Sequence, residues 1–135
     1  MRTRTLFLAA GAGFLYLLTV NALFFPLVFP EGPPVRYSNP RAVDMPHYHL
    51  LAFFITALLM AYIYPMLYRG GSIWKEGLRT GIILALFVSI PMGLHEYAMT
   101  DVSFLAQVFP ALWVTVTWGI AGIVIGAVYK LKPHN

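Results

Sequence analysis

Four polar side chains in an otherwise apolar chain have the types and spacing to do chemistry. His47 and His49 stand two residues apart, and His95 is followed directly by Glu96. Imidazole and carboxylate groups are common ligands of metal ions, and histidines from two helices can hold a haem iron. A positioned His–Glu pair can also act as acid and base beside a pocket. These residues therefore define the candidate metal site of the chain: His47, His49, His95 and Glu96.

Helix geometry limits what these residues can do together. Residues two apart on a helix point about 200° apart, so His47 and His49 converge only if their helix begins after His47. A metal ion, a haem between His49 and His95, and an empty cluster in the headgroup zone all remain open. An enzyme working on lipids at the outer leaflet is a further alternative. No nucleophile motif, phosphate-binding loop or carboxylate pair supports it, and the absence of Cys removes thiolate chemistry.

The elements that must position these residues are four long apolar stretches. The chain is 59% hydrophobic and 10% charged over 135 residues, with a mean hydropathy of +0.73. A helix of roughly 20 apolar residues crosses a hydrocarbon core of about 30 Å. The sequence predicts an all-α integral membrane protein, a single transmembrane domain over residues 1–135. The expected spans are residues 5–29, 47–68, 80–99 and 104–129, with a proline-rich extracytoplasmic loop over 30–46.

The charged residues orient these spans. Short connections after the second and third spans favour antiparallel neighbours, hence an up-down-up-down bundle. The side that holds both termini then carries seven basic residues and one acidic residue: Arg2, Arg4, Arg69, Lys75, Arg79, Lys130, Lys132 and Glu76. The other side carries Arg36, Arg41, Glu31, Asp44, Glu96 and Asp101. The positive-inside rule places both termini in the cytoplasm, so the expected location is the cytoplasmic (inner) membrane. The basic residues are explained by orientation and lipid contact, so we expect no nucleic-acid partner.

This topology predicts an outward-facing polar pocket. The second span enters from the outside and the third returns to it, which puts the histidines of both spans at one depth. Asn21 falls in the outer part of the first span and Gln107 in the first turn of the fourth. Polar groups in a membrane tend to face the bundle interior. The expected ligand-binding residues are Asn21, His49, His95, Glu96 and Gln107.

Small residues mark the faces on which the helices can pack. Ala9 and Gly13 stand four apart in the first span, and Gly122 and Gly126 form a GxxxG pair in the fourth. Such pairs let helices approach closely, either within one chain or between two copies. We expect packing within the chain, with self-association as the alternative. No carboxylate or Lys lies near the midplane, which disfavours a proton-coupled transporter.

Glycine and aromatic placement in the second half resembles small four-span bacterial inner-membrane proteins of unknown function. The residues that carry this resemblance are Gly77, Gly81, Gly93, Trp118, Gly119, Gly122, Gly126 and Tyr129. The resemblance implies a four-helix fold and carries over neither an activity nor a catalytic residue. Short loops, glycine-rich packing faces and the lack of a midplane charge lead us to expect a non-enzymatic protein of the lipid bilayer, either an accessory subunit bound to a membrane-protein partner or a homo-oligomer. The alternative is a membrane protein that binds a metal ion, haem or small ligand through His49, His95 and Glu96.

Overall fold

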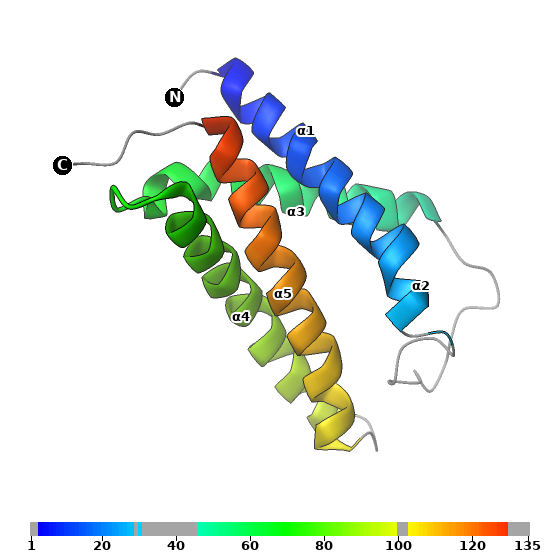
Figure 1. Ribbon diagram of the computed structural model, residues 1–135. Helices are drawn as coiled ribbons and strands as arrows, with labels where there is room; N and C mark the ends of the chain where they lie inside the picture. The colour runs from blue at the N-terminus through cyan, green and yellow to red at the C-terminus, as the bar shows by residue number, and fades with distance from the viewer. Residues whose placement is uncertain (1–2, 29, 31–45, 100–102, 130–135) are drawn as a thin grey trace.

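A computed structural model describes residues 3–28, 30, 46–99 and 103–129, and apart from short connections the described chain is helical (Figure 1). The side chains of Pro46, Ala106 and Gln107 are not described. The elements are α1 (Thr3–Thr19), the π-helical turn η1 (Val20–Phe24), α2 (Phe25–Val28), α3 (Pro46–Leu67), α4 (Ile73–Met99) and α5 (Phe104–Tyr129). Four helices are long and apolar enough to cross a membrane, with α1, η1 and α2 forming one of them. The predicted all-helical class is confirmed, and the four helices that are long and apolar enough to cross a membrane coincide with the four predicted spans. The predicted loop over 30–46 falls almost entirely outside the described residues.

One helix boundary and one local helix geometry differ from the expectation. The stretch from Ser72 to Arg79, expected as a connection, is mostly the beginning of α4, which starts at Ile73. The carbonyl of Ser72 accepts the first helical bond, from the N–H of Glu76 at 2.9 Å. In the first span, α1 widens into η1 before Pro26, and the N–H of Phe25 donates to the carbonyl of Val20. A π-type turn relieves the clash that a proline ring causes with the carbonyl four residues earlier.

The tightest helix pair is α4 with α5, which run side by side in opposite directions (Figure 1). Their backbones approach at glycines from both helices. A Cβ on Gly77 would lie 2.6 Å from the Cα of Ile123, and one on Gly81 would overlap the carbonyl of Trp118. Gly122 in turn lies against the carbonyl of Gly77. Only glycine fits at such a seam, as in other closely packed membrane helices.

Small residues also seat α1 on α3 and α5. Ala9 and Ala10 are fully buried, and a Cβ on Gly13 would lie 2.9 Å from the Cδ1 of Ile125 and 3.5 Å from the Cβ of Ala57. The expected packing face of the first span is thus used within the chain. Most other large apolar side chains point outward, Phe87 being 77% exposed. That exposure suits a chain whose solvent is lipid rather than water.

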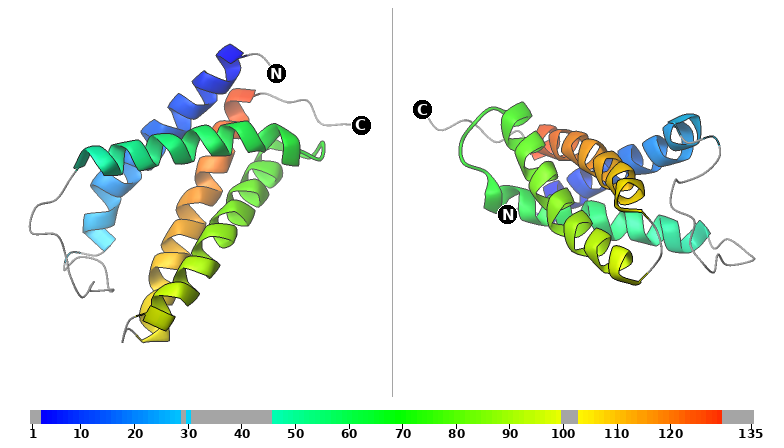
Figure 2. Two further views of the ribbon diagram at one scale, coloured as in Figure 1. Left: turned by 180° about the vertical axis from the view of Figure 1, so that it is seen from behind. Right: turned by 90° about the horizontal axis from the view of Figure 1, so that it is seen from below.

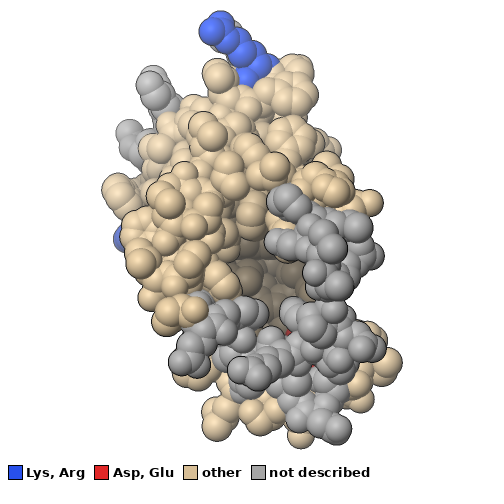
Figure 3. Space-filling model, turned by 90° about the vertical axis from the view of Figure 1, so that its right-hand side faces the viewer, with Lys and Arg blue, Asp and Glu red and all other residues tan. Residues whose placement is uncertain are grey.

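The second long helix, α3, does not follow the others. In Figures 1 and 2, α3 crosses the α4–α5 pair steeply. The end of α3 therefore lies close to this pair, and the beginning of α3 lies apart from it. The first turn of α3 and the last turn of α4 consequently lie apart. We call the region around the α3–α4 connection the closed end, and the region of those two separated turns the open end. Figure 3 looks at the face where α2 and the beginning of α3 lie, and uncharged residues cover most of its described part.

Candidate functional site

A buried ion pair occupies the closed end. Glu76, in the first turn of α4, is only 6% exposed. Its Oε2 lies 2.7 Å from Nη2 of Arg79, one turn further along the same helix. A carboxylate buried to this degree needs a charged or hydrogen-bonded partner, and Arg79 supplies one. The remaining contacts of these two side chains reach across to α3.

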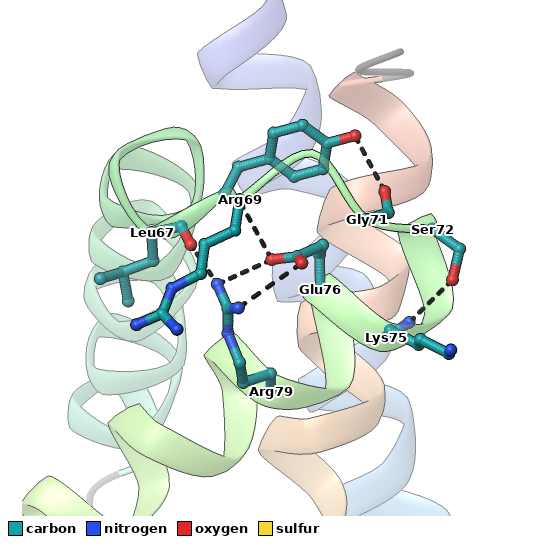
Figure 4. Close-up of polar contacts among 8 residues, drawn as sticks. Leu67, Arg69, Gly71, Ser72, Lys75, Glu76 and Arg79 are labelled. Carbon is teal, nitrogen blue, oxygen red and sulfur yellow. Dashed lines mark hydrogen bonds and ion pairs between the residues drawn. The ribbon is translucent and has the colours of Figure 1, made fainter. Parts of the chain in front are cut away.

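Those contacts tie the end of α3 to the beginning of α4 (Figure 4). The Nη2 of Arg79 donates to the carbonyl of Leu67, and the N–H of Arg69 donates to Oε2 of Glu76 at 3.2 Å. The last carbonyls of a helix have no partner within it, so the guanidinium satisfies a group that burial would otherwise leave unpaired. We call Leu67, Arg69, Glu76 and Arg79 the α3–α4 clamp.

The connection inside the clamp is itself fixed. Gly70 has a φ of 88°, a left-handed conformation that glycine adopts without steric cost. The hydroxyl of Tyr68 donates to the carbonyl of Gly71 at 2.9 Å. A Cβ on Gly71 would lie 2.6 Å from Oε1 of Glu76, so this glycine leaves room for the carboxylate. The clamp and this connection therefore fix the end of α3 relative to the beginning of α4.

A stack of tyrosines continues the closed end toward α5. Tyr64 is buried and stacks on Tyr129, with ring centroids 5.7 Å apart and planes 10° apart. The hydroxyl of Tyr129 donates to the carbonyl of Ala61 at 2.7 Å, which joins α5 to α3. The ring of Tyr64 lies against Gly126, where a Cβ would overlap it. Both members of the predicted GxxxG pair thus pack within the chain, Gly122 on α4 and Gly126 on α3.

Asn21, a predicted ligand-binding residue, joins two helices instead. Its Oδ1 accepts from Nε1 of Trp113 in α5 at 3.3 Å, and its Nδ2 donates to the carbonyl of Leu17 at 2.8 Å. The ring of Phe25 meets Trp113 edge to face, 5.6 Å between centroids. The oxygen of the Asn21 amide therefore holds η1 against α5, while its nitrogen bonds to the preceding turn of its own span.

The structure does not bring the histidines of the two spans together. His47 and His49 lie in the first turn of α3, and His95 and Glu96 near the end of α4, at the two separated turns of the open end (Figure 2). All three histidine side chains are exposed and Glu96 is half-buried. Because α3 begins at Pro46, both of its histidines are helical and point to different sides. No group of three His, Asp or Glu side chains within metal-binding reach exists among the described residues. Gln107 lies in α5, but its side chain is outside the described part.

The polar contacts of the closed end were missed from the sequence. Glu76 was counted only as the single acid on a strongly basic side, and its helix was expected to begin after it. The signal was nevertheless present, because Glu76 and Arg79 have the three-residue spacing at which opposite charges meet on a helix. A lone carboxylate among seven basic residues is a natural candidate for an ion pair.

The comparisons with known proteins give no match, neither to a family model, nor to a curated protein, nor to a solved structure. The resemblance to small four-span bacterial proteins therefore stays a prediction.

Proposed function

We propose that this chain is a non-enzymatic membrane protein that serves as an accessory subunit of a larger complex in a bacterial cytoplasmic membrane. The four long helices would span the bilayer in alternating directions, with both termini and the closed end in the cytoplasm. The charges support this orientation. Arg69, Lys75 and Arg79 belong to the closed end, and basic residues gather on the cytoplasmic side of membrane proteins.

One observation carries the subunit proposal: the described polar side chains with interhelical contacts hold helices together. Glu76 and Arg79 fix the α3–α4 connection, Asn21 fixes η1 on α5, and Tyr129 fixes α5 on α3. The histidines, the natural candidates for chemistry, lie at separated helix ends. A chain of this kind holds a defined shape and offers apolar helix surfaces to lipid and to a membrane-protein partner.

Self-association is the weaker form of the same proposal. Gly77 and Gly81 of α4 pack against α5, Gly122 packs against α4, and Gly126 packs against Tyr64. A homodimer would therefore need a different surface from the GxxxG face that most readily mediates it. We accordingly favour a different protein as the partner.

The proposal is tested by purifying the tagged chain from its native membrane in a mild detergent. We expect a second membrane protein to co-purify in fixed ratio and to be lost in a harsher detergent, while the chain itself stays helical. A control pull-down with a tagged, unrelated four-helix membrane protein identifies non-specific partners. A folded monomer without any stoichiometric partner would contradict the subunit role, and a stable homo-oligomer would select self-association.

A further inference from the structure

The α3–α4 connection carries positive charge that its own carboxylate does not balance. Between Arg69 and Arg79 the chain has three basic residues and only Glu76 as an acid. Glu76 is committed to Arg79 through the ion pair and to the backbone of Arg69. In the part of the chain that the structure describes, the side chains of Arg69 and Lys75 have no acidic partner.

Arg69 takes part in the clamp through its backbone only. Its N–H is held by Glu76, while its side chain is exposed. In Figure 4, the guanidinium group of Arg69 extends away from Glu76, whereas that of Arg79 turns back toward Glu76 and Leu67. The exposed guanidinium of Arg69 can therefore reach an anion outside the clamp, and the planar fork of arginine matches a phosphate well.

The neighbouring residues place this charge at the level of lipid headgroups. Trp74, in the first turn of α4, is 71% exposed, and exposed Lys75 follows it. Tryptophan rings concentrate at the boundary between hydrocarbon and water. Because α3 ends and α4 begins here, the connection lies at a membrane surface if both helices span the bilayer. The phosphates of the lipid headgroups are then the nearest abundant anions.

We propose that the α3–α4 connection binds the phosphate of an anionic phospholipid headgroup, with Arg69 as the principal contact and Lys75 as an outer one. Basic sites at the cytoplasmic ends of membrane helices recognise such headgroups. The inference rests on the proposed membrane orientation but not on the existence of a protein partner. It differs from general surface attraction, which would act equally on Arg4, the exposed basic residue at the start of α1.

The test measures lipid binding to the full chain. The chain in neutral detergent is titrated with phosphatidylglycerol or phosphatidylcholine, and bound lipid is counted by native mass spectrometry. We expect phosphatidylglycerol to bind in preference, and Arg69→Gln to weaken it about fivefold, the effect of one basic residue near an anionic surface. Arg69→Lys should retain part of the affinity because it keeps the charge without the fork. Arg4→Gln should leave the affinity unchanged.

Two outcomes would overturn the proposal. Equal losses for Arg69→Gln and Arg4→Gln would mean general attraction rather than a site. Displacement of phosphatidylglycerol by millimolar inorganic phosphate would mean a site for free phosphate. Circular dichroism on each variant confirms that the helices are intact, since the clamp uses the backbone rather than the side chain of Arg69. Failure here leaves the co-purification result of the subunit proposal untouched, so the two proposals fail separately.

Discussion

The closed end and the open end of this molecule contain similar residue types and behave differently. At the closed end, Glu76 and Arg79 of α4 bind backbone groups at the end of α3 and in the connection that follows it. Glycines of α4 and α5 let these two helices pack closely beside the clamp. At the open end, His49 and His95 lie on helices that have already separated, and both are exposed. The comparison teaches that polar residues from two helices come together in this chain where the helix ends are close, and that a similar position along two neighbouring helices is not enough.

The glycine seam gives the largest expected effect. Gly81→Ala places a methyl group on the carbonyl of Trp118, so α4 and α5 must move apart. We expect the free energy of unfolding to fall by about 3 kcal/mol, the upper range for overpacking. Unfolding in mixed micelles, followed by circular dichroism, measures it.

The matched control for this variant is in the same helix. Gly93→Ala meets nothing within 4 Å and should raise stability by up to about 1 kcal/mol through helix propensity. Similar results for the two alanine variants would show that the seam is not as tight as described.

The clamp gives the next largest effect. Glu76→Gln removes the charge that pairs with Arg79 and should lower the free energy of unfolding by about 2 kcal/mol. Breaking a buried pair costs more, but Arg79 is 29% exposed and water screens part of the loss. Lys75→Gln, in the same helical turn but exposed, should change stability by less than about 0.5 kcal/mol. An equally mild Glu76→Gln would refute the clamp.

A smaller effect is expected from the contact between η1 and α5. Asn21→Leu loses the hydrogen bond to Trp113 and should cost about 1 kcal/mol, as interhelical bonds in membranes do. Thr19→Val is the control, because the Thr19 hydroxyl bonds only within its own helix. In a double-mutant cycle with Trp113→Phe, additive losses would argue that the two side chains do not interact.

The open end should respond least. His49→Ala and His95→Ala are each expected to change the free energy of unfolding by less than about 0.5 kcal/mol, because both side chains are exposed. Elemental analysis and an absorption spectrum of the purified protein complete this test. A stoichiometric metal or a haem band that either variant abolishes would revive the histidine-based alternative and contradict the separation of these residues.

The sequence predicted the helices well because lipid imposes a simple rule on them. A span must be apolar for about 20 residues, and each of the four stretches meets that condition. The small residues of α1 and α5 likewise indicated where helices pack closely, and Gly13, Gly122 and Gly126 do contact neighbouring helices.

The direction of α3 and the contacts of Glu76 could not be predicted in the same way. A short connection brings two helix ends together but does not fix the angle between them, and α3 leaves the bundle at a steep angle. The expectation that the histidines of the second and third spans lie close together assumes that the helix axes are parallel. Because α3 crosses α4 and α5 steeply, the first turn of α3 lies apart from the last turn of α4. Asn21 stands out in the sequence as a polar residue in an apolar span, but the sequence does not identify Trp113 as its partner. A partner 92 residues away in the chain depends on how the helices dock.

The contrast between the two ends is tested most directly by measuring distances between pairs of spin labels with pulsed electron paramagnetic resonance, with the protein in lipid nanodiscs. The chain has no natural Cys, so labels attach only where they are introduced. Met66→Cys with Lys75→Cys reports the closed end, and His49→Cys with His95→Cys reports the open end; all four positions are exposed. We predict a short, narrow distance distribution for the first pair and a clearly longer one for the second. Equally short distances at both ends would contradict the account.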